Sequence, residues 1–227
     1  MSHKLTINDI QPVTHDVRQY TFEKPDGYEF EPGQATEVSI DKEGWRDANH
    51  PFTFTSLNDD SYLQFVIKSY PSSLSGHKGL TEQIGKLEKG DSFIVKDPWG
   101  TISYKGPGVF LAGGAGITPF IAIFRELYEE GNIDGNRLIF SNKTADDVIL
   151  EDEFNTILGN NFTSVLTDEP QEGHLFLDGF IDKEFLEEQI DDFNQPFYVC
   201  GPPPFMDAIL GYLKELGADP EGLVFEE

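Results

Sequence analysis

The first hundred residues alternate apolar and polar side chains in short runs, a pattern typical of half-buried β-strands. Turn sequences such as Pro25-Asp26-Gly27 and Glu31-Pro32-Gly33 separate the runs. One helical segment, Leu80 to Ile84, interrupts the series. We therefore expect an antiparallel barrel or sandwich with strands near residues 4–9, 17–22, 35–40, 52–56, 62–67 and 92–95.

The hydrophobic pattern changes after Lys105-Gly106-Pro107-Gly108. Apolar strands now alternate with longer helices, which indicates a doubly wound parallel sheet. The chain is accordingly predicted to have two domains, residues 1–105 and residues 106–227. In the second we expect strands near 109–112, 137–141, 162–166 and 196–200, and helices near 119–130, 150–158, 182–190 and 203–216.

A glycine-rich turn joins the first predicted parallel strand to its helix. The sequence Gly113-Gly114-Ala115-Gly116-Ile117-Thr118-Pro119 directly follows the apolar run 109–112. Glycines at the second and fourth positions allow a tight turn and a close approach to a pyrophosphate, whose charge would meet the N-H groups at the helix start. A buried strand-turn-helix without a ligand has the same residues, so other positions must decide.

Composition and charge exclude several classes of function. The 227 residues include 41 Asp and Glu against 16 Lys and Arg, a formal charge of -25, which repels nucleic acids and anionic membranes. Cys200 is the sole cysteine of the sequence, so an intramolecular disulfide is excluded and a reducing cytoplasm is expected. No apolar run is long enough to span a bilayer, and we expect neither a signal peptide nor a metal site.

The segment His50-Pro51-Phe52-Thr53-Phe54-Thr55-Ser56 places aromatic rings and hydroxyls at alternating positions. Taken alone, it is typical of a barrel core. Its context is more specific, because Gly79-Leu80-Thr81, the glycine turn, Cys200-Gly201-Pro202-Pro203 and Phe225-Glu226-Glu227 follow in that order. This order of motifs resembles the ferredoxin-NADP reductase superfamily. The resemblance implies a six-stranded antiparallel flavin-binding β-barrel followed by a doubly wound, parallel-sheet nucleotide-binding domain.

In that family the barrel binds flavin through an Arg-x-Tyr-Ser/Thr motif. The match places His50 at the arginine, Phe52 at the tyrosine and Thr53 at the hydroxyl, with Pro51 after the histidine. The His-Pro-Phe-Thr version is similar to the form in the ferric reductase and NADPH oxidase branch. Phe52 would offer an apolar face to the isoalloxazine, and Thr53 would hydrogen-bond near N5. His50 cannot form the bidentate contact that arginine makes with phosphate, so we expect the phosphate of the flavin to be bound more weakly.

The resemblance implies two further flavin-binding segments in the barrel. Gly79-Leu80-Thr81 is similar to the family's Gly-x-Ser/Thr segment, which offers backbone N-H groups and a hydroxyl to phosphate at a helix start. The alternative is that Thr81 only caps the helix. Val66-Ile67-Lys68 matches the strand whose backbone holds the ribityl chain and phosphates in related proteins.

The second domain would bind a nicotinamide nucleotide. Gly114, Gly116 and Thr118 match the family's Gly-x-Gly-x-x-Pro loop. Dehydrogenases that select NAD usually carry an acidic residue about 20 residues beyond the loop, whereas that region here reads Ser141-Asn142-Lys143. A hydroxyl and a lysine suit a 2'-phosphate, which favours NADPH over NADH. The alternative is an ordinary loop with a solvated lysine.

Catalytic roles are expected for Thr53, Cys200 and Glu226. Cys200-Gly201-Pro202 ends the last predicted parallel strand and opens a helix. A lone buried cysteine is usually a small hydrophobe, but the matching cysteine of the family lies beside the nicotinamide C4 and aligns it. We expect alignment rather than nucleophilic attack, since no adjacent base is evident. Glu226 matches a family carboxylate near both cofactors, and its alternative is an exposed terminal acid.

These features predict an oxidoreductase that transfers hydride from NADPH or NADH to bound FAD, with FMN as the alternative flavin. Family habit makes flavodoxin or ferredoxin the expected electron acceptor. Reduction of free flavin or chelated ferric iron is an alternative reaction. A nonenzymatic flavin- or nucleotide-binding subunit or sensor is an alternative of another class.

Overall fold

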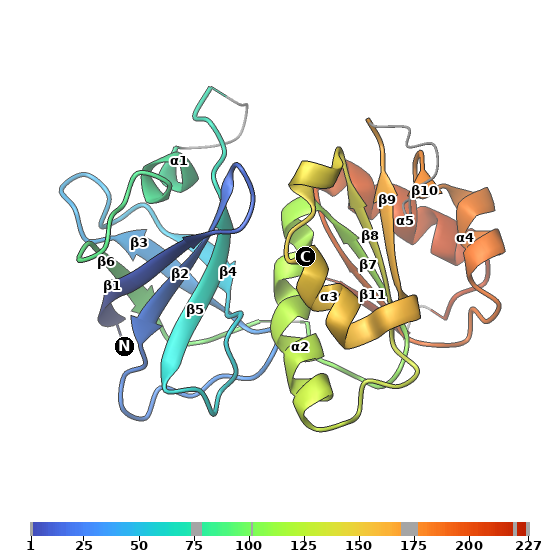
Figure 1. The fold of residues 1–227 in the computed structure, drawn as a ribbon, viewed down its shortest axis with the longest axis horizontal. Helices are drawn as coiled ribbons and strands as arrows, with labels where there is room; N and C mark the ends of the chain where they lie inside the picture. The colour runs from blue at the N-terminus through green and yellow to red at the C-terminus, as the bar shows by residue number, and fades with distance from the viewer. Residues whose placement is uncertain (1, 74–78, 101, 169–176, 220–221, 226–227) are drawn as a thin grey trace.

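The computed structural model describes residues 2–73, 79–100, 102–168, 177–219 and 222–225. An antiparallel barrel and a helix-covered parallel sheet lie side by side, with helix α2 (Thr118–Glu129) between them (Figure 1). The predicted combination of a β-barrel and an α/β domain is therefore confirmed. The barrel strands lie within residues 2–96 and the parallel strands begin at Val109, while the boundary at residues 105 and 106 stays a prediction.

The barrel sheet contains six strands in the order β4-β3-β6-β1-β2-β5. All its neighbouring pairs are antiparallel. A short helix, α1 (Leu80–Ile84), has the bounds that the sequence predicts. The strands are β1 (Ser2–Pro12), β2 (Val17–Glu23), β3 (Ala35–Ile40), β4 (His50–Thr53), β5 (Tyr62–Lys68) and β6 (Ser92–Lys96).

The strand predicted at residues 52–56 lies two to three residues earlier, at His50–Thr53. It pairs with β3 from Val38 opposite His50 to Ala35 opposite Thr53. Beyond that point the amide of Thr55 donates to the carbonyl oxygen of Gln64 on β5. The chain thus leaves one edge of the sheet and crosses to the other. Alternation continues through this crossing, so the pattern alone cannot place the end of the strand.

Aromatic side chains fill the barrel interior. Phe54 stacks on Phe30 with ring centroids 4.3 Å apart and also contacts Phe65 at 5.1 Å. The hydroxyl of Tyr20 donates to the carbonyl oxygen of Ile84, 3.0 Å away, which ties α1 to the barrel. Burial of such rings is the main favourable contribution to the stability of a small barrel.

The parallel sheet has six strands in the order β10-β9-β8-β7-β11-β12. Every neighbouring pair is parallel. Sequence analysis finds four of these strands and misses two, because β10 and β12 are too short to show a period. The strands are β7 (Val109–Gly113), β8 (Arg137–Asn142), β9 (Phe162–Leu166), β10 (Leu177–Asp178), β11 (Phe197–Cys200) and β12 (Leu223–Phe225).

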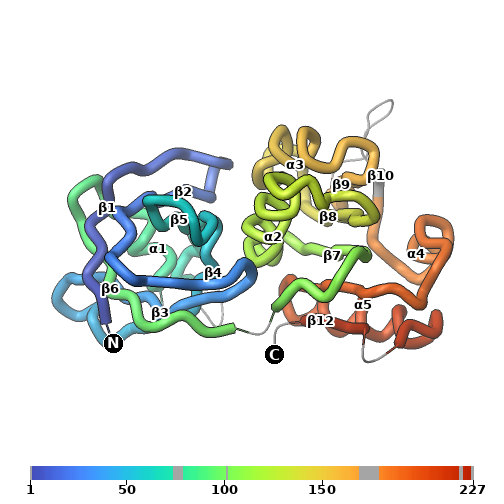
Figure 2. The backbone as a smooth tube through the Cα atoms, turned by 90° about the horizontal axis from the view of Figure 1, so that it is seen from below, coloured from blue at the N-terminus to red at the C-terminus, as the bar shows by residue number. Residues whose placement is uncertain are grey.

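Helices cover both faces of this sheet, as Figure 2 shows. Helices α2 and α3 (Glu151–Leu158) share one hydrophobic cluster with the strands, and α4 (Lys183–Gln189) and α5 (Pro203–Glu215) share the other. The first cluster also contains Val17 and Val66 from the barrel. Helix α2 is therefore buried on two sides, against its own sheet and against the barrel.

The order of the parallel strands creates a switch point beside β7. The chain runs from β7 outward through β8 and β9, and later returns to add β11 on the other side of β7. In open α/β sheets, ligands bind beyond the carboxyl ends of the strands at such a point. The glycine turn after β7 and the segment after β11 both lie there.

Candidate functional site

The glycine turn at the carboxyl end of β7 leaves open space beside Gly114. Gly114 adopts a positive φ of +52°, and an added Cβ there would meet no atom within 4 Å. Residues Gly114–Ile117 make a 3-10 turn that runs directly into α2. The hydroxyl of Thr118 donates to the carbonyl oxygen of Ala115 at 3.0 Å, which closes the turn. Open space at Gly114, together with the N-H groups that a helix start generally leaves without intrahelical partners, fits a phosphate.

The segment after β11 packs against this turn. Gly116 lies so close to Cys200 and Gly201 that no side chain fits between them. Cys200 is 8% exposed and belongs to the cluster that contains Ala112 and Ile117. The structure therefore brings together the two motifs that are 84 positions apart in the sequence (116 against 200). Pro202 follows as the residue that precedes α5.

The end of β8 contributes an unusual polar group to the same edge of the sheet. Asn142 is 6% exposed, and neither its Nδ2 nor its Oδ1 has a hydrogen-bond partner among the described residues. An unpaired buried amide of this kind costs about 1–3 kcal/mol. Ser141 pairs with Gly113 across the strands, and Lys143 is exposed. This donor set fits a polar, phosphate-bearing ligand.

The predicted flavin residues of β4 lie on an edge strand. His50 is exposed and Phe52 is half-buried, with their ring centroids 5.6 Å apart. Strands β4 and β5 are the two edges of the barrel sheet, so the outer backbone groups of each pair with no further described strand. Flat rings and backbone-binding ligands fit such an opening. At Gln64 the edge of β5 is covered by the amide of Thr55. Pro51 and Thr53 are also half-buried.

Strand β5 directs its side chains to two different places. Ile67 enters the barrel core, whereas Val66 packs in the cluster of the second domain. The ammonium of Lys68 lies 3.2 Å from a carboxylate oxygen of Asp16 and 3.7 Å from one of Asp147. Because Asp147 belongs to the turn after β8, the last residue of β5 touches the segment that follows the carboxyl end of β8.

His15 lies beside the same two carboxylates. His15 Nε2 lies 3.6 Å from an oxygen of Asp16 and 4.0 Å from one of Asp147. Burial raises the pKa of Asp147, but the hydrogen bond from Thr144 and the charge of Lys68 outweigh it, so that the pKa lies below its usual range. Sequence analysis does not predict this group of charges, because its members come from two domains.

The segment around α1 differs in one respect from its sequence interpretation. Gly79, with φ +81°, precedes the helix, and the Thr81 side chain does not cap it. Instead the Thr81 hydroxyl accepts a hydrogen bond from the amide of Tyr70, 3.2 Å away. Glu82 accepts from the amide of Ser72 at 2.7 Å. Its bonds to Lys86 and Ser72 lower the pKa of Glu82 to about 2. The helix start is thereby attached to the loop after β5.

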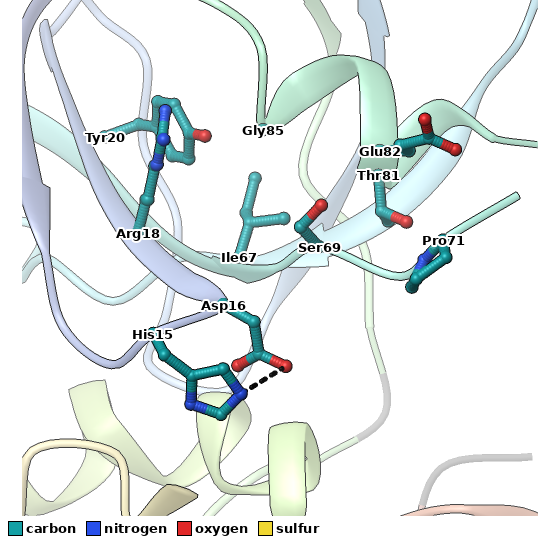
Figure 3. Close-up of a pocket in the computed structure, with 10 residues that line it drawn as sticks. All are labelled: His15, Asp16, Arg18, Tyr20, Ile67, Ser69, Pro71, Thr81, Glu82 and Gly85. Atoms are coloured by element: carbon teal, nitrogen blue, oxygen red, sulfur yellow. Dashed lines mark ion pairs between the residues drawn. The ribbon is translucent and has the colours of Figure 1, made fainter. Parts of the chain in front are cut away.

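A cavity of about 500 Å³ lies between α1 and the ends of β2 and β5 (Figure 3). Ile67 and Thr81, two of the predicted flavin residues, line it, but no residue of β4 does. Arg18 adds a cation to the wall that sequence analysis does not identify. The other lining residues are His15, Asp16, Tyr20, Ser69, Pro71, Glu82 and Gly85.

Glu226 lies outside the described residues, and the last described residue of β12, Phe225, pairs with Val199, one position before Cys200.

Among the described residues, no helix combines the length and apolar character needed to cross a bilayer. The roles assigned to the individual site residues stay predictions.

Comparisons with known proteins agree with this architecture. Residues 2–91 match the model of a family described as "FAD-binding domain", and residues 110–210 match the "Oxidoreductase NAD-binding domain" family. The chain is 31% identical to NADH-cytochrome b5 reductase 2 of Emericella nidulans over 243 residues, which cover 94% of this chain and 74% of that protein.

A second relative is the reductase component of propane 2-monooxygenase from Rhodococcus jostii, with 28% identity over 97% of this chain. The chain spans 62% of the length of that protein. In fold, the structure is similar to a ferredoxin NADP+ reductase from Neisseria gonorrhoeae, solved with bound FAD and NADP. The TM-score is 0.82 at 18% identity, covering 99% of this chain and 98% of the other. The chain therefore belongs to the ferredoxin-NADP reductase superfamily, with an FAD-binding barrel followed by an oxidoreductase NAD-binding domain.

Proposed function

We propose that the protein transfers hydride from NAD(P)H to FAD and passes electrons on to a small electron-carrier protein. One observation carries the proposal: Lys68, which ends β5, lies 3.7 Å from Asp147 in the turn after β8. The barrel edge to which we assign the flavin thus contacts the turn after β8, next to the sheet edge to which we assign the dinucleotide. Two cofactors bound at these edges would lie near one another, as hydride transfer requires.

In this proposal the barrel residues hold and orient the flavin. FAD, when bound, accepts hydride and releases electrons one at a time. Phe52 offers a flat apolar face, Thr53 offers a hydroxyl, and the free backbone edge of β5 around Ile67 binds the ribityl chain. Thr81 and the N-H groups near Gly79 hold phosphate. Arg18, in the wall of the cavity, supplies positive charge that His50 cannot supply as a bidentate group.

The second domain holds and aligns the dinucleotide. The turn around Gly114 and Gly116 receives the pyrophosphate at the start of α2. Asn142 gains the hydrogen-bond partners that it lacks among the described residues. Lys143 pairs with a 2'-phosphate, which favours NADPH, and Cys200 contacts the nicotinamide ring. Several curated relatives are named for NADH, so both dinucleotides belong in the test.

The experiment begins with the absorbance spectrum of the purified protein and the identity of its released flavin. Anaerobic mixing with NADPH and with NADH then measures flavin bleaching in a stopped-flow instrument. We expect bound FAD that bleaches within seconds, faster with NADPH. A protein that binds FAD but is not bleached by either dinucleotide would instead act as a nonenzymatic flavin subunit or sensor. A colourless protein that ignores added FAD and FMN would contradict the proposal.

For the electron acceptor we propose a flavodoxin or a ferredoxin. Relatives named for cytochrome b5 and for an oxygenase component support a protein carrier in general. Because the formal charge of the protein is -25, the dependence of the reduction rate on ionic strength distinguishes an acidic carrier from a basic one. An acidic carrier would be reduced faster as salt rises, because screening weakens repulsion, whereas a basic carrier would be reduced more slowly. With flavodoxin or ferredoxin we expect the reduction rate to increase as the salt concentration rises.

The matched comparison uses free flavin and a ferric chelate as small acceptors. If these are reduced faster than flavodoxin, ferredoxin and cytochrome b5 at every salt concentration, a protein carrier is not the acceptor. Saturation of the rate with carrier concentration would separate specific docking from random collision.

A further inference from the structure

We propose that Arg125 is a positioning residue. It holds the nucleotide-binding domain against the barrel at Thr55 and Gln64, next to the proposed flavin contacts. Arg125 lies in α2, and its guanidinium contacts both domains. It donates to both carboxylate oxygens of Glu153 on α3, at 2.5 and 2.9 Å. It also donates across the domain interface to the carbonyl oxygen of Thr55 at 2.5 Å and to Oε1 of Gln64 at 2.8 Å. The inference rests on the proposed function.

The two barrel partners belong to the segments that carry the predicted flavin contacts. Thr55 follows Thr53 by two residues, and Gln64 precedes Val66 by two residues on β5. A shift of Thr55 would therefore move the β4 edge of the proposed flavin site, and a shift of Gln64 would move the β5 edge.

These partners form a buried polar network of their own. Thr55 and Ser56 are fully buried and Gln64 is 6% exposed. The amide of Gln64 donates to the Ser56 hydroxyl at 3.0 Å, and the Thr55 hydroxyl donates to Gln64 Oε1 at 3.3 Å. Arg125 completes this network from the other domain, with one-fifth of its side chain exposed. Removing it would leave a buried carbonyl and a buried amide oxygen short of a donor, which is costly.

Helix α2 connects this contact to the glycine turn. The helix begins at Thr118, immediately after the turn, and Arg125 lies seven residues further, about 10 Å along the axis. An α-helix of three turns transmits displacement as a rigid element. The contact at Arg125 therefore helps to set where the dinucleotide turn lies relative to the barrel.

A cavity opens at the domain interface beside Arg125. Its volume is about 590 Å³, and it is lined by Arg125 and Glu153 of one domain and by Gln19, Tyr62 and Gln64 of the other, among further residues. Polar and charged side chains make up most of this lining. The guanidinium joins the two domains through a planar fork of fixed donors, which the single ammonium of lysine cannot reproduce.

Arg125→Lys tests the proposal by removing the fork and keeping the charge. Hydride transfer is sensitive to distance, and a misplacement of about 1 Å can cost about 100-fold. We expect the limiting rate of flavin bleaching at saturating dinucleotide to fall about 10- to 100-fold. We expect flavin content and the dinucleotide concentration at half-maximal rate to change less than about threefold. A purely structural role would change unfolding and flavin content instead.

Arg137→Lys is the matched control. Arg137 is also partly buried and also bonds a glutamine, through the carbonyl oxygen and Oε1 of Gln189, and it contacts Thr163. All these partners lie within the second domain. The proposal requires the limiting rate of this variant to stay near the wild-type value.

Hydrogen exchange supplies a readout that does not depend on flavin reduction. In the protein without cofactors, we expect faster exchange of the amides of Thr55 and Gln64 in Arg125→Lys, and wild-type exchange in Arg137→Lys. If Arg125→Lys fails to fold, Glu153→Gln is used, with a smaller change expected in the same direction.

An unchanged limiting rate and unchanged exchange in Arg125→Lys would overturn the inference, as would an equal loss of rate in Arg137→Lys. If wild-type protein with bound FAD is not bleached by either dinucleotide, the proposed function fails. The exchange measurement still decides whether the contact at Arg125 orders the barrel around Thr55 and Gln64.

Discussion

Gly116 and Cys200 are in backbone contact at the switch point of the parallel sheet. A Cβ at position 116 would lie 2.3 Å from the carbonyl oxygen of Cys200 and 2.5 Å from its carbonyl carbon. Both are backbone atoms of a central strand, so they cannot move aside as the end of a flexible side chain can. The requirement for glycine at 116 thus comes from this close packing, whereas Gly114 provides the positive φ and the open space above the turn.

Gly116→Ala should destabilise the protein by about 3 kcal/mol, the upper end of the usual cost of overpacking. The matched control is Gly211→Ala, in α5, where an added Cβ would meet no atom within 4 Å. That change should stabilise by about 1 kcal/mol through helix propensity. Urea unfolding followed by circular dichroism measures both. A Gly116→Ala protein as stable as wild type would show that the contact is looser than described.

Cys200→Ala should slow flavin bleaching about tenfold, and Cys200→Ser should slow it less, because a ring-aligning side chain contributes contact rather than a covalent bond. Bound flavin should be retained in both variants. Stopped-flow reduction with NADPH gives the limiting rates. Complete loss of reduction in both variants, with flavin still bound, would indicate nucleophilic chemistry instead of alignment.

Thr53→Ala should lower the limiting rate of flavin reduction about 10-fold, the effect expected when one hydrogen bond to the reacting ring is removed. Thr53→Ser keeps the hydroxyl and should restore most of the rate. The flavin absorbance spectrum of each variant provides an independent check of the environment of the ring. If the serine variant is as slow as the alanine variant, the hydroxyl is not the functional group.

Lys143→Ala should reduce kcat/KM for NADPH about tenfold and leave the value for NADH within about twofold, since only the first dinucleotide carries the 2'-phosphate that the ammonium would bind. Lys89→Ala, which alters an exposed lysine of the barrel, is the control. Equal changes in kcat/KM for NADPH and NADH would show that Lys143 does not select between them, as expected if it is a solvated lysine in an ordinary loop.

Alkaline pH should destabilise the barrel between about pH 10 and pH 12. Burial raises the pKa of Tyr20 to about 12 from an unfolded value near 10, although the charge of Arg18 opposes the shift. Below pH 10 both states keep the proton, so the contribution to stability is complete. Between the two values the unfolded chain loses the proton and the folded protein keeps it, so stability falls as pH rises. Burial raises the pKa of Tyr28 to about 12 as well.

Urea unfolding at pH 8, 10 and 11 measures this effect. Tyr20→Phe should be less stable at pH 8, because it lacks the hydrogen bond to Ile84, and should lose stability less steeply as pH rises. An identical slope in Tyr20→Phe and wild type would show that Tyr20 does not contribute to the alkaline transition.

Local patterns predict most of the elements correctly, and the failures have clear causes. The bounds of α1 and the run of strands in the barrel follow from alternation and turn residues. The end of β4 does not, because the alternation continues as far as Thr55, whose amide bonds to β5, whereas the pairing with β3 ends at Thr53. Strand β12, three residues long, exists only because it can pair with β11.

The candidate site divides in the same way. Each of the motifs around Phe52, Gly114 and Cys200 is a contiguous stretch of sequence, and the order in which these motifs follow one another along the chain carries the resemblance to the family. Arg18 and Arg125 each stand alone among strand or helix residues. Their partners lie in distant segments, and no local spacing indicates them.

Residues that are neighbours along the chain are enough to predict the class of each domain, the glycine-rich turn and the superfamily, because periodicity and short motifs are local properties of a sequence. The charged and polar groups that meet across the domains follow from packing in three dimensions: Lys68 with Asp147, and Arg125 with Thr55 and Gln64. These contacts depend on how two separately patterned domains pack, and packing joins atoms whose separation along the chain carries no signal.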